Sequence, residues 1–152
     1  MLIGVISDTH GLLRQEVLSH LRSCDVILHG GDINRQDILE TLRAIAPLYV
    51  VRGNNDKEWA EGMPVFEDFI LDGIHVYMTH KKKDLPEDLS KFDLIITGHT
   101  HRYEEKTVND IVFLNPGSCG PRKETQPITM ALVSIDDGQI SIQKIDIPHR
   151  KE

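Results

Sequence analysis

The chain has 152 residues, the size of one ordinary domain and too short for two separate hydrophobic cores. Apolar residues make up 39% of it and charged residues 27%, which is typical of globular proteins and unlike disordered chains. The formal net charge of −7 disfavours a protein that coats nucleic acid or an anionic membrane, because electrostatic repulsion would oppose binding. We therefore expect residues 1–152 to form a single domain that holds no stable complex with nucleic acid.

The sequence also bears on the compartment. The apolar N-terminal stretch Leu2–Ile6 is too short for a secretory signal, and no apolar run reaches the length of a membrane span. Cys24 and Cys119 belong to no C-x-x-C pair, so two free thiols are expected rather than a disulfide. These features predict a cytoplasmic protein that does not associate with membranes.

Buried strands alternate with amphipathic helices over the first third of the chain. Apolar runs predict strands at 2–7, 25–30 and 48–52, and helical periodicity predicts helices at 12–22 and 36–45. Strands connected through helices pair in parallel through right-handed crossovers. The first part of the chain is therefore predicted to form a parallel β-α-β-α-β unit.

The second half is rich in predicted strands. Turns at Asp72-Gly73, Asn109-Asp110 and Asp136–Gly138 predict three hairpins. Their strands are expected at 68–71 with 74–79, 102–107 with 111–114, and 130–135 with 139–147, and a further buried strand is expected at 93–97. A short helix is predicted from Pro86 to Lys91, since proline is favoured in the first turn of a helix. A parallel β-α-β-α-β unit followed by a second half rich in hairpins requires either a mixed sheet or two stacked sheets.

Side chains of the kinds that bind divalent metals follow five of the predicted strands. They are Asp8, His10, Asp32, Asn54, His80, His99 and His101. Ligands of open α/β sheets bind beyond the carboxyl ends of the strands, so these residues are expected to meet. The forms Gly-Gly-Asp, Gly-Asn-x-Asp and Gly-His-x-His are each expected only about 0.03 to 0.07 times by composition. Polar turn residues are the alternative interpretation, but turns do not require this many histidines.

The residue types indicate which ions such a site would bind. Carboxylate and amide oxygens with imidazole nitrogens, and without thiolates, suit divalent metals such as Mn²⁺, Fe²⁺, Ni²⁺ and Zn²⁺. Seven candidate ligands are too many for one four-coordinate ion. They fit two ions about 3.5–4 Å apart that share a bridging carboxylate.

Six motifs together resemble the calcineurin-like metallophosphoesterases, and most of all their small single-domain bacterial and archaeal phosphodiesterase branch. The motifs are ISDTHG (6–11), HGGD (29–32), RGNND (52–56), MTH (78–80), GHTH (98–101) and NPGS (115–118). The resemblance extends from Leu2 to about Ser118. It implies an α/β fold: a four-layer α-β-β-α sandwich of two stacked mixed sheets flanked by helices.

The resemblance also implies how the ligands divide. Asp8, His10 and His101 would hold one metal, and Asn54, His80 and His99 the other, with Asp32 bridging the two. Two divalent ions per chain are expected, with Mn²⁺ favoured over Ni²⁺, Fe²⁺, Zn²⁺ and Mg²⁺. Asp32 and His99 are expected to take part in catalysis together with Asn55.

Two residues depart from the family pattern. Asn55 stands where many relatives have histidine or cysteine, and an amide donates a hydrogen bond to a phosphoryl oxygen but supplies no proton. This predicts a preference for esters with acidic leaving groups. Lys81 stands where relatives often have glycine, so that Lys81, Lys82 and Lys83 would lie at the rim and bind or steer an anionic substrate. A solvated charged surface is the alternative interpretation of this run.

Two further polar residues are expected to support the ligands. Asp56 is predicted to cap the segment after the third strand or to hold Asn54 in place. His29 lies at the buried end of the second strand, and a supporting role is favoured over a ligand role because Asp32 fits better as a ligand.

The function implied is that of a hydrolase, a dinuclear metal-dependent phosphoesterase. A hydroxide bridging the metals would attack small phosphodiesters in line, with phosphomonoesters as a second substrate class. The alternative is a non-catalytic protein-interaction scaffold of the same fold, as in the retromer subunit. That alternative predicts missing ligands, whereas all seven positions are filled here. A homo-oligomer is compatible with the sequence.

Overall fold

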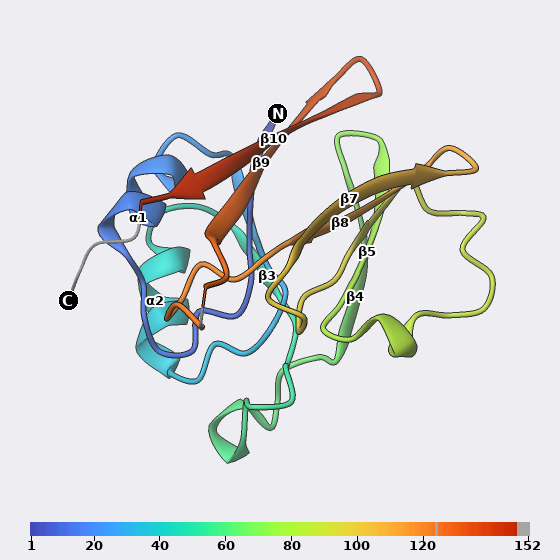
Figure 1. Cartoon of the computed structure of the whole chain (residues 1–152). Coiled ribbons are helices and arrows are strands. Elements are labelled where there is room, and N and C mark those ends of the chain that lie inside the picture. Colours follow the sequence, from blue (N-terminus) through green and yellow to red (C-terminus); the bar gives the residue numbers. More distant parts are fainter. Residues whose placement is uncertain (124, 149–152) are drawn as a thin grey trace.

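The computed structural model describes residues 1–123 and 125–148, and in this part of the chain ten strands form two five-stranded sheets. The strand order is β10-β9-β1-β2-β3 in the first sheet and β4-β5-β6-β8-β7 in the second (Figure 1). Both sheets contain parallel and antiparallel pairs. The prediction of two stacked mixed sheets is therefore confirmed.

The first sheet is built around the predicted parallel unit. Its elements are β1 (Leu2–Ile6), α1 (Gln15–Leu21), β2 (Val26–His29), α2 (Gln36–Arg43) and β3 (Leu48–Val50). The strands β1, β2 and β3 pair in parallel, and the hairpin of β9 (Ile128–Asp136) and β10 (Gln139–Ile147) adds to the free side of β1. Helix α1 begins later than predicted, because Arg14 is extended and its guanidinium donates to Gly120 O at 3.2 Å.

The second sheet contains the remaining hairpins. Its strands are β4 (Phe66–Leu71), β5 (Ile74–Thr79), β6 (Leu94–Ile96), β7 (Tyr103–Val108) and β8 (Ile111–Pro116). The hairpin turns lie where predicted, and Asp72, Asn109 and Asp137 have the positive φ angles that tight two-residue turns require. The strands β5, β6 and β8 pair in parallel, so β5 and β6 end on the same side of this sheet.

The helix predicted over Pro86–Lys91 is wrong. The structure has a short 3₁₀ turn at Lys82–Asp84 and irregular backbone after it. Six residues are too few to nucleate a helix without tertiary support, and the Asp88 side chain instead accepts a hydrogen bond from Ser90 N at 3.0 Å. This segment covers the outer face of the second sheet, with Leu85 and Leu89 packed against Phe92 and its aliphatic and aromatic neighbours.

The hydrophobic core lies in two layers. Between the sheets, residues of β1 and β2 such as Val5 and Leu28 pack against residues of β5 and β6 such as Met78 and Leu94. On the other face of the first sheet, Ile6 and Ile27 pack against α1 and α2, which lie on the side away from the second sheet (Figure 1). Both cysteines are free thiols, as predicted. No helix of the described residues is long and apolar enough to cross a membrane.

The stability of this arrangement is expected to depend on the layer between the sheets. Leu28 is fully buried there, so Leu28→Ala is expected to lower the free energy of unfolding by about 2–5 kcal/mol. Ile70 on β4 is 64% exposed, and Ile70→Ala should change it by only about 0.5 kcal/mol or less. Urea unfolding of the two variants measures the difference. Equal losses would show that the space between the sheets is not the principal core.

Candidate metal centre

The seven predicted ligand side chains meet where the two sheets come together. Asp8 and His10 follow β1, Asp32 follows β2, and Asn54 follows β3. From the second sheet, His80 follows β5, and His99 and His101 follow β6. The loops of one sheet are tied to those of the other, because His80 Nδ1 donates to Gly30 O at 2.7 Å.

The side chains form two adjacent groups. Asp8, His10 and His101 make one group, and Asp32, His80 and His99 make the other, with the candidate ligand atoms of each group within 4.8 Å of one another. In the first group, Asp8 Oδ1 lies 3.4 Å from His101 Nε2 and 3.7 Å from His10 Nε2.

Asn54 belongs with the second group. Its Oδ1 lies 3.2 Å from His99 Nδ1. Asn54 therefore lies beside His99, in the second group of side chains.

Asp32 faces both groups with a single oxygen. Its Oδ2 lies 3.2 Å from His80 Nε2 in its own group and 3.6 Å from His10 Nε2 in the other. Asn55 fixes this carboxylate, since its backbone N–H donates to Oδ1 at 2.8 Å and its side-chain amide to Oδ2 at 3.1 Å. This placement suits a carboxylate shared between two cations.

Buried polar atoms at the centre lack hydrogen-bond partners. Asp8 is fully buried and His80 is 3% exposed, yet Asp8 Oδ1 and His80 Nε2 form no hydrogen bond with the residues that the structure describes. Leaving a buried carboxylate oxygen uncompensated is costly. Because Gly30 O can only accept, Nδ1 of His80 carries the hydrogen and its Nε2 is left as an electron-pair donor. The donor set therefore fits divalent cations.

The pKa values of the carboxylates and imidazoles at the centre are shifted by one another. Burial favours a raised pKa for Asp8, but contacts with His10, His101 and Ser7 outweigh it and hold this pKa well below its usual range. The Asp8 carboxylate raises the pKa of His10. Burial opposes the charged form of His80, but the Asp32 carboxylate raises its pKa nevertheless. The carboxylates thus attract positive charge into the centre.

Most of these ligand residues have strained backbones. Positive φ angles are found at Asp8 (56°), His10 (45°), Asp32 (60°), His99 (74°) and His101 (64°). This conformation is uncommon for residues other than glycine, and it clusters at functional sites. Sequence reasoning gave these residues as candidate ligands but did not predict this backbone conformation. Aspartate and histidine enter this region more readily than most residues, which is the only sequence signal for it.

Asp56 connects two of the ligand-bearing loops. Its Oδ2 accepts hydrogen bonds from Asp32 N and Gly53 N, both at 2.9 Å, and its Oδ1 accepts them from Ile33 N at 2.9 Å and Asn34 N at 2.8 Å. The buried carboxylate therefore holds the loop after β2 against the loop after β3. The sequence predicted a supporting role, but it did not predict that one side chain serves both loops.

His29 forms hydrogen bonds with two of the loops that carry candidate ligands. Its Nδ1 accepts a hydrogen bond from Gly31 N at 3.1 Å, so its Nε2 carries the hydrogen and donates to Thr9 Oγ1 at 3.0 Å. Burial lowers the pKa of His29 to about 4, and the imidazole is neutral. It contacts the loops that carry Asp8 and Asp32, as expected of a supporting residue.

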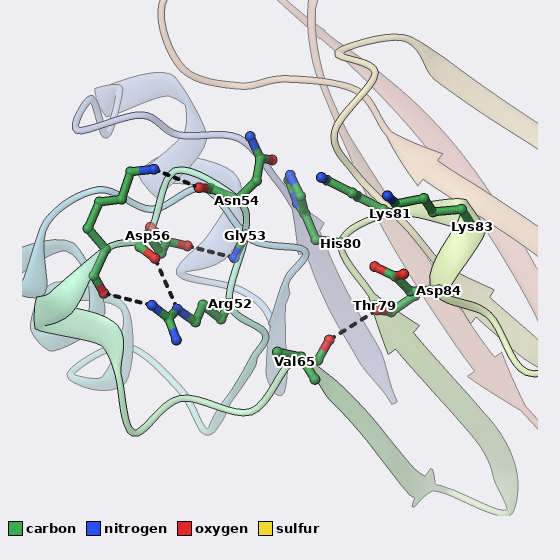
Figure 2. Close-up of a pocket in the computed structure, with 11 residues that line it drawn as sticks. Arg52, Gly53, Asn54, Asp56, Val65, Thr79, His80, Lys81, Lys83 and Asp84 are labelled. Atoms are coloured by element: carbon green, nitrogen blue, oxygen red, sulfur yellow. Dashed lines mark hydrogen bonds between the residues drawn. The ribbon is translucent and has the colours of Figure 1, made fainter.

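The lysine run is divided by the structure. Lys81 and Lys83 line a cavity beside His80 and Asn54 (Figure 2), whereas Lys82 Nζ lies 3.6 Å from Glu104 Oε1. The prediction that all three lysines lie at the rim is thus wrong for Lys82, because alternate side chains of this turn point to different sides. Burial lowers the pKa of His99, and the neighbouring His80 and Lys81 side chains lower it further.

A separate cavity of about 490 Å³ opens beside the candidate ligands. It is lined by His10, Asp32, Asn54, Asn55, His99 and His101, and by Pro121, Arg122 and Lys123. A volume of this size accommodates a small molecule. The two groups of ligands are therefore accessible from outside.

Comparison with known proteins gives the family. The model of the calcineurin-like phosphoesterase superfamily domain matches residues 1–138, nearly the whole chain. The chain belongs to the calcineurin-like phosphoesterase superfamily. All six motifs that carried the resemblance lie within the matched residues.

Known proteins from several organisms are similar to the chain. A probable metallophosphoesterase of Methanothermobacter thermautotrophicus is 34% identical over 146 residues, which cover 87% of this chain and 85% of that protein. A phosphodiesterase of Methanocaldococcus jannaschii is 27% identical, with coverage of 78% and 84%. The crystal structure of Vps29 from Entamoeba histolytica in complex with zinc has a TM-score of 0.74 and 26% identity, with coverage of 96% and 99%.

Removing the charge of Asp56 is expected to weaken metal binding. Asp56→Asn places an amide group against backbone N–H donors, which disturbs the loops of Asp32 and Asn54, and the affinity for Mn²⁺ should fall about 10–100-fold. Calorimetric titration measures this. Asp88→Asn is the matched control, because Asp88 also accepts a backbone hydrogen bond but lies away from the centre. Unchanged affinity in Asp56→Asn would contradict the supporting role.

The buried neutral His29 predicts a pH dependence of stability. Its folded-state pKa of about 4 is below the ordinary value of 6.5, so the unfolded chain binds more protons and the stability falls as the pH decreases through this range. Between pH 7 and pH 5 the wild type should lose about 2 kcal/mol that His29→Gln does not lose. Urea unfolding of the metal-free proteins tests this, and parallel pH profiles would show that the imidazole is not held neutral.

Proposed function

We propose that the chain is a dinuclear metal-dependent phosphoesterase that hydrolyses small phosphodiesters, with phosphomonoesters as a second substrate class. The position of Asp32 Oδ2, facing both groups of ligands, is the observation that supports this most directly. Membership of the superfamily and the phosphodiesterase among the relatives support the reaction class.

The two groups of side chains would each hold one cation. Asp8, His10 and His101 would hold one, and Asn54, His80 and His99 the other, with Asp32 shared. Mn²⁺ is favoured for this set of oxygen and imidazole donors, ahead of Ni²⁺, Fe²⁺, Zn²⁺ and Mg²⁺. When bound, the cations would supply activation of water and neutralisation of charge on the phosphoryl oxygens.

The chain's own residues would orient and bind the substrate. Asn55 uses one side-chain N–H to hold Asp32, and its second N–H is available to donate to a phosphoryl oxygen. The lowered pKa of His99 keeps this imidazole neutral, as a ligand requires, and the charge of Lys81 attracts an anionic ester. The cavity of about 490 Å³ would receive a substituent of the ester.

The alternative function is a non-catalytic protein-interaction scaffold of the same fold. A similar protein, Vps29 of Entamoeba histolytica, has been crystallised in complex with zinc. Metal binding by itself does not demonstrate catalysis. The scaffold predicts loss of ligands, whereas this chain keeps all seven side chains in two compact groups. Turnover of a phosphate ester is the property that distinguishes them.

Hydrolysis of bis(p-nitrophenyl) phosphate tests the proposed function. Metal-stripped protein should be inactive and should regain activity when Mn²⁺ is added, and Ni²⁺, Zn²⁺ and Mg²⁺ are assayed singly beside it. Asp32→Asn should lower kcat/KM by about 100-fold or more, since it removes the charge shared by both groups, while Asp88→Asn should not change it. No turnover with any of these metals would favour the scaffold.

The amide at position 55 predicts dependence on the leaving group. The wild type should hydrolyse aryl phosphodiesters much faster than alkyl phosphodiesters of similar size, because Asn55 cannot protonate a departing alkoxide. Asn55→His supplies a group that can, and it should narrow the aryl-to-alkyl ratio of kcat by about tenfold. Steady-state kinetics on matched esters measure the ratio. Equal rates in the wild type would show that another group provides the proton.

A further inference from the structure

A second cavity, of about 430 Å³, has Asn54 in its lining, as does the cavity of about 490 Å³. Its lining includes Asn54 and His80 of the metal centre together with Arg52, Lys57, Lys81 and Lys83 (Figure 2). In Figure 2 the side chain of Lys81 extends towards His80 and Asn54. The cavity therefore adjoins the place where a phosphoryl group would be bound.

The lysines that line this cavity have no acidic partner among the described residues. Lys57 Nζ donates only to a neutral acceptor, Asn54 O at 3.2 Å. Lys81 and Lys83 form no ion pair with residues in the described ranges, 1–123 and 125–148. Arg52 adds a further positive charge, although its guanidinium is occupied by the backbone oxygens of Asp56 and Lys57.

Acidic groups of the lining compensate only part of this charge. Asp56 and Asp84 are the carboxylates of the lining. Asp56 keeps its negative charge although both of its oxygens accept hydrogen bonds from backbone N–H groups, so two carboxylates oppose the three lysines and Arg52. A chain with a formal net charge of −7 thus concentrates cations beside the very centre where an anionic ester would react.

We propose that this basic cavity binds a second phosphate group, so that the preferred substrate is a small phosphate ester with another phosphate on one of its substituents. The assignment rests on the proposed function for the chemistry at the metal centre. Lysines are suitable partners for phosphate as mobile point charges. Binding energy gained at a remote phosphate can be used to position the reacting one. Lys57, Lys81 and Lys83 are thereby assigned to substrate selection.

A matched pair of chromogenic esters tests the assignment. Thymidine 5′-(p-nitrophenyl phosphate) carries only the reacting phosphate, and its 3′-phosphorylated form carries a second one. With Mn²⁺ and at low ionic strength, kcat/KM should be at least about tenfold higher for the 3′-phosphorylated ester. This ratio should fall to about threefold or less in Lys83→Gln and in Lys57→Gln. Equal kcat/KM values for the two esters in the wild type would overturn the subsite and leave the phosphodiesterase function intact.

The neighbouring Lys82→Gln is the matched control. Its amine contacts Glu104 and lies outside the lining of the cavity, so the ratio should stay at the wild-type value. Circular dichroism and the Tm of each variant verify that the fold is retained. If Lys82→Gln lowers the ratio as much as Lys83→Gln does, general attraction by surface charge explains the effect and the subsite is refuted.

Binding measurements separate the subsite from catalysis. Adenosine 3′,5′-bisphosphate should bind at least about tenfold more tightly than adenosine 5′-monophosphate in calorimetric titrations, and Lys83→Gln should remove the difference. If neither ester is hydrolysed but this pattern is found, the proposed function fails and the subsite stands. If the two nucleotides bind equally, or if their difference persists in both Lys83→Gln and Lys57→Gln, the subsite fails.

Discussion

The close approach of two sheets at their carboxyl ends is the constraint on which the rest of the structure depends. Each sheet alone delivers only part of the ligand set, and the groups are completed when the loops after β5 and β6 reach those after β1 and β2. The approach leaves no room for side chains at two points. A Cβ at Gly98 would overlap Ser7 Oγ and Asp8 Oδ2, and one at Gly31 would overlap His80 Nδ1. The apolar layer between the sheets sets this distance, so packing and chemistry are coupled.

The close approach of the two sheets also explains where the charged side chains around the centre lie. Two carboxylates are enclosed with little solvent, and the surrounding imidazoles, amides and lysines are arranged to face them or the space beside them. A small fold with a hydrophobic interior tolerates such a cluster only where buried negative charge is compensated. The supporting hydrogen bonds of Asp56 come from backbone N–H groups, and those of His29 join it to Gly31 N and the Thr9 hydroxyl, so these bonds hold the loops in place without engaging the candidate ligand atoms.

Much of this could be predicted from the sequence, for physical reasons that differ between elements. The strand ends and the hairpin turns were predictable, because apolar runs and Asp-Gly or Asn-Asp pairs act locally. The Pro86–Lys91 segment was not, since its conformation depends on a few apolar anchors such as Leu85 and Leu89 against the second sheet. The two-loop role of Asp56 and the separation of Lys82 from its neighbours depend on which way a turn projects its side chains. Spacing along a chain does not specify that direction.

The left-handed backbone at five ligand residues limits how this centre can change in evolution. Each position requires both a donor side chain and a residue that tolerates the conformation, and Asp, Asn and His satisfy both conditions better than most. Valine and isoleucine offer no donor atom and also tolerate a positive φ poorly, so they would be excluded for both reasons. Glutamate offers a donor atom, but it would still bear the energetic cost of the left-handed backbone. Replacement of these residues by glycine would therefore relieve backbone strain as it removed donor side chains. A descendant that no longer needed the donor atoms could lower the conformational cost of these loops in this way.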